Sequence, residues 1–98
     1  MSKRFNSFKY TYITAAAPTT TQVKGSDAIL KRICVNTPVS TGVITIYDNI
    51  GSDTTTPVAI ITSTADMKPY FIDFDIRMLT GLKIVTSVAA QNITVVSE

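Results

Sequence analysis

The chain has 98 residues, of which 45% are hydrophobic and 16% are charged, and its net charge is +2. This composition excludes an intrinsically disordered chain, since disorder requires low hydrophobicity and high net charge. The length corresponds to one domain with a thin core, and the abundant β-branched residues favour an all-β fold over a helical one.

The N-terminal part of the chain is predicted to be an extended arm followed by a linker, over residues 1–19. Pro18 lies in the sequence AAAPTTT and cannot donate a hydrogen bond to a sheet, so residues 15–19 are assigned to the linker. Residues 20–98 then form the folded domain. The arm begins with a basic cluster but has no apolar segment of the kind found in signal peptides.

The arm contains one strand with an aromatic side. In the sequence FKYTYIT, Phe8, Tyr10 and Tyr12 alternate with other residues and so point the same way. Basic and aromatic residues together could form a platform for single-stranded nucleic acid. We expect instead that the rings are buried against this subunit or a neighbour, because each can bury on the order of 150 to 250 Å².

A strand from Thr20 to Lys24 and a stronger one from Ala28 to Asn36 follow. In regular alternation the second strand places Lys31 on one face with apolar residues and Arg32 on the other. Such mixed faces are typical of an edge or interface strand, where basic side chains lie over apolar surface. Cys34 is the only cysteine, which excludes an intramolecular disulfide, and we expect it to be a small buried hydrophobic residue.

The segment GVITIYDNIGSDTTTPVAIIT predicts a hairpin with strands at residues 42–48 and 58–62. Its connection is too long for a two-residue turn and is predicted to be an exposed surface loop. The loop has closely spaced oxygen ligands but lacks the bidentate glutamate and the flanking helices of an EF-hand, so no metal site is predicted. The residues assigned to the exposed loop are Asp48, Asn49, Gly51 and Asp53.

The remaining segments predict three more strands. YFIDFDI, residues 70–76, alternates apolar residues with Phe71, Asp73 and Asp75, and we expect the two aspartates to form a solvated face. LKIVTS and NITVVSE are predicted to close the chain as a hairpin. Seven or eight short antiparallel strands without a helical period indicate a small β-sandwich or barrel.

The sequence offers little for catalysis. It has no histidine, which excludes Ser-His-Asp and Cys-His sites, and its only glutamate is Glu98. We therefore predict no catalytic residues, no cofactor and no metal. No run of residues approaches the roughly 18 apolar positions of a membrane span, so a membrane partner is not expected.

Several short patterns together resemble small virion proteins of tailed bacteriophages. They are a strand ending in Tyr47-Asp48, a return strand with Ala-Ile, a hydrophobic-Asp-Phe strand, then Gly81-Leu82 and a final Thr-Val-Val strand. The resemblance extends over roughly residues 28–96. It implies a capsid decoration (cement) protein, made in the host cytoplasm and located in the virion, that binds the major capsid protein or other virion proteins as a homo-oligomer, with a trimer as one option.

Other functions stay open at this point. The chain could be a tail, fibre or head-tail adaptor component, or a binding module for single-stranded nucleic acid or carbohydrate. Nucleic acid is the less favoured partner, because a net charge of +2 is mild for a phosphate-binding surface. The residues predicted to contact other subunits or the capsid are Arg4, Phe5, Phe8, Tyr10, Tyr12, Lys31 and Arg32.

Overall fold

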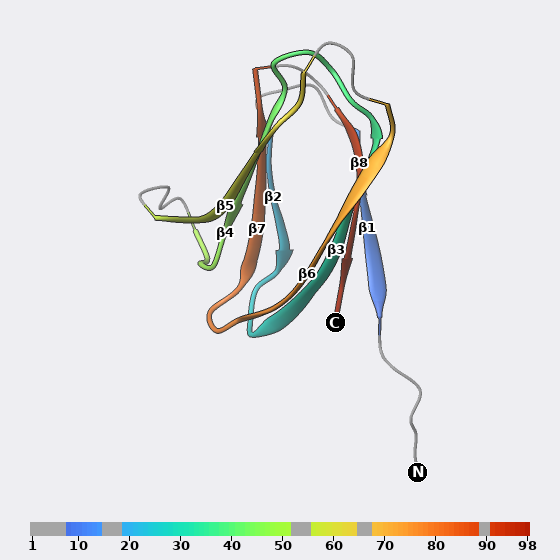
Figure 1. Cartoon of the computed structure of the whole chain (residues 1–98). Coiled ribbons are helices and arrows are strands. Elements are labelled where there is room, and N and C mark those ends of the chain that lie inside the picture. Colours follow the sequence, from blue (N-terminus) through green and yellow to red (C-terminus); the bar gives the residue numbers. More distant parts are fainter. Residues whose placement is uncertain (1–7, 15–18, 52–55, 65–67, 89–90) are drawn as a thin grey trace.

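The computed structural model describes residues 8–14, 19–51, 56–64, 68–88 and 91–98, and within these residues it contains strands and no helix. Two four-stranded antiparallel sheets face each other (Figure 1), which confirms the predicted all-β sandwich. None of the described segments is a helix that could cross a bilayer. The strands are β1 (Lys9–Ile13), β2 (Thr19–Lys24), β3 (Ala28–Thr37), β4 (Val43–Tyr47), β5 (Pro57–Thr62), β6 (Tyr70–Met78), β7 (Leu82–Ser87) and β8 (Asn92–Ser97).

The strand order is β1-β8-β3-β6 in the first sheet and β2-β7-β4-β5 in the second. The predicted hairpin is confirmed, since β4 pairs with β5 from Val43 opposite Thr62 to Tyr47 opposite Pro57. The predicted closing hairpin is wrong, because β7 pairs with β2 and β4 while β8 pairs with β1 and β3. Both strands are rich in apolar residues, and each is buried at the centre of its own sheet.

The core lies between the two sheets and consists mainly of aliphatic side chains that alternate along the strands. Burial of such side chains contributes about 25 cal/mol per Å² of apolar surface removed from water. Ile44 and Ile46 of β4 are fully buried, as their alternation predicts. The buried apolar cluster contains Ile13, Ala28, Leu30, Ile33, Val35, Ile44, Ile46, Met78, Leu82, Ile84, Ile93 and Val95.

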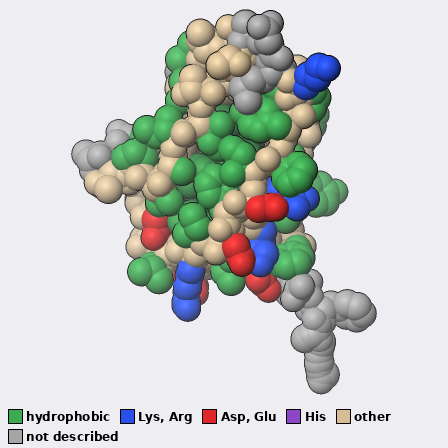
Figure 2. Space-filling view, in the orientation of Figure 1, with side chains coloured by type: hydrophobic (Ala, Val, Ile, Leu, Met, Phe, Trp, Pro, Cys, Tyr) green, Lys and Arg blue, Asp and Glu red, His purple; other side chains and the backbone are tan. Residues whose placement is uncertain are grey.

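Partly buried apolar residues extend this core toward the side of the sandwich where β5 and β6 lie. Figure 2 shows hydrophobic side chains filling the space between the two sheets on this side. Those on β5 and β6 that pack against the core are Ala59, Ile61, Tyr70, Phe74 and Ile76. The alternation predicted for residues 70–76 is therefore confirmed, with Asp73 and Asp75 on the opposite, exposed face.

A β-bulge interrupts the alternation of β3. Leu30 lies opposite Ser97 of β8 and Arg32 lies opposite Val96, so Lys31 is an extra residue. An extra residue reverses the direction of the side chains that follow it. Leu30 and Ile33 both point into the core, and the prediction of strict alternation along this strand is wrong.

The first strand belongs to the sandwich. β1 is the edge strand of the first sheet and pairs with β8 from Lys9 opposite Ser97 to Ile13 opposite Ile93. Residues 1–7 and 15–18 lie outside the described part of the chain. The division into an arm over residues 1–19 and a domain from residue 20 stays a prediction.

Candidate interaction surface

Four aromatic side chains are exposed on the outer face of the first sheet. Phe8, Tyr10 and Tyr12 come from β1 and the residue before it, with exposed fractions of 46%, 77% and 58%. Phe71 comes from β6 at the other edge and is 56% exposed. The expectation that the β1 rings are buried against their own subunit is wrong, and their burial against a neighbour stays a prediction.

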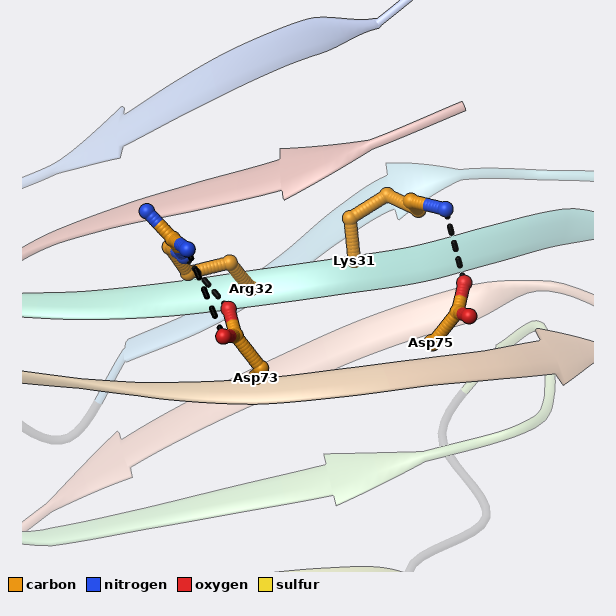
Figure 3. Close-up of polar contacts among 4 residues, drawn as sticks. All are labelled: Lys31, Arg32, Asp73 and Asp75. Atoms are coloured by element: carbon orange, nitrogen blue, oxygen red, sulfur yellow. Dashed lines mark hydrogen bonds and ion pairs between the residues drawn. The ribbon is translucent and has the colours of Figure 1, made fainter.

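Two ion pairs join the strands between these rings (Figure 3). Lys31 Nζ lies 2.7 Å from Asp75 Oδ1, and Arg32 Nε lies 2.5 Å from Asp73 Oδ1 with a second bond of 3.3 Å to Oδ2. The bulge in β3 makes this possible, because it places Lys31 and Arg32 side by side on the outer face. Such exposed pairs add little to stability, since water and salt screen them.

Each of the two cations also lies over an aromatic ring. Lys31 Nζ is 5.2 Å from the centroid of the Phe8 ring, and the Arg32 guanidinium carbon is 4.2 Å from that of Phe71. Cations are attracted to the negative face of an aromatic ring at these distances. The rings are therefore held in place by the charges beside them, which reduces the entropy lost when a partner binds.

The ion pairs also shift the titration of their members. The hydrogen bond from Arg32 lowers the pKa of Asp73, and the hydrogen bond to Asp75 raises the pKa of Lys31. Asp73 therefore stays ionised, and Lys31 and Arg32 stay charged, at neutral pH. The surface between the rings is consequently ionic but nearly neutral, and Figure 2 shows charges of both signs side by side there.

A shallow cavity of about 430 Å³ lies among these groups. No group of three or more histidine, cysteine or acidic side chains suited to a metal ion occurs among the described residues. A cavity of this kind can receive a side chain of another protein. The residues that line it are Phe8, Lys31, Arg32, Asp73, Asp75 and Val96.

Amide side chains fix the orientation of Tyr12 at the other end of the face. Asn92 Nδ2 donates a hydrogen bond of 2.6 Å to the Tyr12 hydroxyl. Asn36 Nδ2 in turn donates to Asn92 Oδ1 and to Thr94 Oγ1, both at 3.0 Å. Cys34, expected to be buried, is half-buried, because the bulge moves it to this outer face.

The predicted exposed loop after β4 is only partly exposed. Asp48 is half-buried, and its carboxylate accepts hydrogen bonds from the backbone N–H groups of Leu79, Thr80 and Gly81 at 2.9, 2.8 and 3.2 Å. Burial raises the pKa of Asp48, but the hydrogen bonds from the three N–H groups together lower it by more, so that the net shift is downward. Asp48 is therefore an anchor that ties the loop to the turn between β6 and β7.

The other predicted loop residues differ in their surroundings. Asn49 is half-buried, whereas Gly51 is exposed and has a φ of 89°, a conformation that favours glycine. Asp53 lies outside the described residues. The prediction of an exposed loop is thus wrong for Asp48 and Asn49, because backbone groups of neighbouring segments surround them.

Two structural polar residues near this loop were not predicted. Gln22 Nε2 donates to the backbone oxygens of Lys24, Asn49 and Leu82 at 2.9, 3.0 and 3.2 Å. Lys83 is 1% exposed, donates to the Gly51 oxygen at 2.8 Å and lies 4.9 Å from the Tyr47 ring centroid. Nothing in the local sequence indicates their roles, since both lie at positions of strands that ordinarily face water.

The structure brings together most of the residues predicted to make contacts. Phe8, Tyr10, Tyr12, Lys31 and Arg32 share the outer face of the first sheet. Arg4 and Phe5 lie outside the described residues. Phe71 was not predicted as a contact residue, although a signal existed, because it is an aromatic residue on the polar side of an alternating strand.

No protein-family model matches the chain, and searches of curated proteins and of solved structures found no significant match. The resemblance to phage virion proteins therefore stays a prediction from the sequence. What the chain does must be argued from its own surface.

Proposed function

We propose that the chain is a non-catalytic structural protein of a tailed-phage particle, and that it decorates the capsid as an oligomer. It attaches through the outer face of its first sheet, either to the major capsid protein or to another virion protein. The observation that carries this proposal is the set of exposed rings Phe8, Tyr10, Tyr12 and Phe71 around two ion pairs on one sheet face.

The composition of this face supports a protein partner. Tyrosine, phenylalanine and arginine are enriched in protein interfaces, where large rings supply contact area and a guanidinium supplies directed hydrogen bonds. A row of exposed rings such as Phe8, Tyr10 and Tyr12 along one strand is a feature of surfaces that serve binding. The cavity beside Arg32 offers a place for a partner side chain.

The paired charges disfavour nucleic acid. A single-strand binding platform combines stacking rings with cations that are available to phosphates. Here Lys31 and Arg32 lie against Asp75 and Asp73, whose carboxylates would repel a phosphate. The sequence adds that the chain has no histidine for general base catalysis, which supports a role without chemistry.

The first experiment measures whether the chain occurs in particles. Phage particles that encode the chain are purified, and the number of copies per capsid is determined by quantitative mass spectrometry. The proposal predicts a fixed copy number related to the symmetry of the capsid. Absence of the chain from intact particles would refute it.

The second experiment tests whether the outer face of the first sheet binds the particle. Purified protein is added to particles assembled without it, and binding of the wild type is compared with that of Tyr10→Ser/Tyr12→Ser. We expect binding to fall by on the order of tenfold to a hundredfold, because loss of the two rings should cost about 1.4 to 2.8 kcal/mol in total and each 1.4 kcal/mol is a factor of ten in affinity. Thermal unfolding should change little, since both rings are exposed.

The matched control removes apolar side chains from the other sheet. Val58 and Ile60 of β5 are 41% and 60% exposed, so Val58→Ser/Ile60→Ser likewise removes two exposed apolar side chains, on the other sheet. This control should bind like the wild type. Equal loss in both double variants would contradict the assignment to the first sheet, and so would equal retention.

A further inference from the structure

The four edge strands of the sandwich are not equally protected against pairing with another chain. An edge strand exposes unpaired backbone N–H and C=O groups, and natural proteins commonly protect such edges with bulges, prolines or charged residues. The edges of the described sheets are β1 and β6 in the first and β2 and β5 in the second. Their registers show which of them are protected.

Three of these edges carry a bulge. In β2, Val23 is an extra residue between the pairs made by Gln22 and Lys24. In β5, Val58 is extra and Pro57 lacks an N–H group. In β6, Asp75 has a φ of 58° and lies within a register shift against β3.

β1 differs from the other three edges. Its pairing with β8 is continuous from Lys9 to Ile13 without a register shift, it contains no proline, and its one charged residue, Lys9, stands at the first position of the strand. Its side chains alternate regularly: Thr11 and Ile13 point toward the core, whereas Tyr10 and Tyr12 point toward solvent. β1 is therefore the regular edge, and a second strand can add to it without distortion.

We propose that β1 pairs antiparallel with β1 of a second copy, about a two-fold axis beside Thr11. The sequence of β1 is complementary to itself in this register, because Tyr10 comes opposite Tyr12 of the second copy and Lys9 comes opposite Ile13. Aromatic residues directly opposite each other on antiparallel strands stabilise the pairing of those strands. The two-fold repeats both tyrosine pairs, as an isologous interface requires.

The pairing defines the oligomeric contact, and in this respect it rests on the proposed function. Two first sheets join into one continuous eight-stranded sheet whose outer faces point the same way. The exposed aromatic rows of the two copies then lie next to each other at its centre. A dimer thereby presents twice the aromatic surface to one partner, and avidity increases the strength of attachment.

The experiment uses a cysteine at the two-fold axis. Opposite residues of antiparallel strands have Cα atoms about 4.5 to 5.5 Å apart, which is within the range of a disulfide. Thr11→Cys in a Cys34→Ser background should therefore form a covalent dimer under mild oxidation, in at least tenfold higher yield than the control. Removal of Cys34 prevents cross-links through the native thiol.

The control moves the cysteine along the same strand. Lys9→Cys in the same background lies on the same side of β1, but two copies of residue 9 are roughly 14 Å apart along the paired strands. It should stay largely uncross-linked. Equal cross-linking at both positions, or none at position 11, would overturn the proposed register.

A measurement on the wild type covers the case in which a variant fails to fold. The protein should sediment as a dimer, and the amide protons of β1 should exchange more slowly as concentration rises. A monomer at high micromolar concentration, or an oligomer whose β1 amides exchange at a concentration-independent rate, would refute the pairing. Dimers that do not bind particles would instead refute the proposed function alone.

Discussion

The outer faces of the two sheets use similar residues in opposite ways. On the first sheet, Lys31 lies over an exposed ring and pairs with a carboxylate that faces solvent. On the second sheet, Lys83 also lies over a ring, that of Tyr47, but both residues are buried beneath the loop that follows β4. The same pairing of cation and ring is a surface feature in one place and an internal one in the other.

The carboxylates show the same contrast. Asp73 binds an exposed arginine, whereas Asp48 binds three consecutive backbone N–H groups. Hydrogen bonds from three backbone N–H groups to one half-buried carboxylate are worth more than a single exposed ion pair. We therefore expect substitutions near the loop to change stability, and substitutions on the first face to change binding.

The largest expected effect on stability is at Gly81, in the turn that Asp48 anchors. A Cβ atom there would lie 2.9 Å from the backbone oxygens of both Asn49 and Lys24. Gly81→Ala should therefore destabilise the protein by about 1 to 3 kcal/mol, a typical cost of overpacking. Chemical denaturation measures the change.

The matched control for this substitution is Gly25→Ala, because a Cβ at Gly25 meets nothing within 4 Å. Its effect should stay within about 0.5 kcal/mol. Equal destabilisation by both substitutions would mean that the loss of glycine itself, rather than crowding at the anchored turn, is responsible.

The second prediction compares the two carboxylates by the same chemical change. Asp48→Asn should cost about 1 to 2 kcal/mol, since it removes the charge and turns an amide NH₂ toward one of the backbone donors. Asp73→Asn should leave stability nearly unchanged, because its partner Arg32 is exposed. Denaturation midpoints for the two variants test this ranking, and a larger loss for Asp73→Asn would reverse the comparison.

The sequence predicted the fold class because alternation in short segments reports burial directly. The strands at residues 43–47 and 70–76 follow their apolar patterns closely. It could not predict that β7 and β8 lie in different sheets, since a hairpin and a crossover between sheets have the same local pattern. Whether two consecutive strands share a sheet depends on their pairing with strands distant in sequence, here β2 and β4 for β7 and β1 and β3 for β8.

The interaction surface was predicted in part for a similar reason. The aromatic row on β1 is visible in the alternation of FKYTYIT, but whether its rings are covered is a property of the tertiary structure. The ion pairs depend on the bulge at Lys31, which no residue type in that strand signals. The structural roles of the exposed Gln22 and the buried Lys83 were missed because their partners include backbone groups distant in sequence.

The smallest expected effect is the dependence of the unfolding free energy on pH and salt, which should differ between Asp48 and Asp73. The pKa values of Asp48 and Asp73 are both lowered in the folded protein, so each carboxylate stabilises the fold above the unfolded pKa of about 3.9, and this stabilisation is lost as the pH falls through the lower folded pKa. The difference in unfolding free energy between wild type and Asp48→Asn should therefore shrink as the pH is lowered from 6 to 2.

High salt should act differently on the two carboxylates. In about 1 M NaCl screening acts over roughly 3 Å, so any acid-dependent contribution of the exposed Asp73 to stability should disappear. The contribution of Asp48 should persist, because backbone N–H groups bind its carboxylate directly. If salt reduces the stability contribution of Asp48 more than that of Asp73, the Asp48 carboxylate acts through solvent-exposed charges. Asp48 would then not differ in kind from the carboxylates on the outer face of the first sheet.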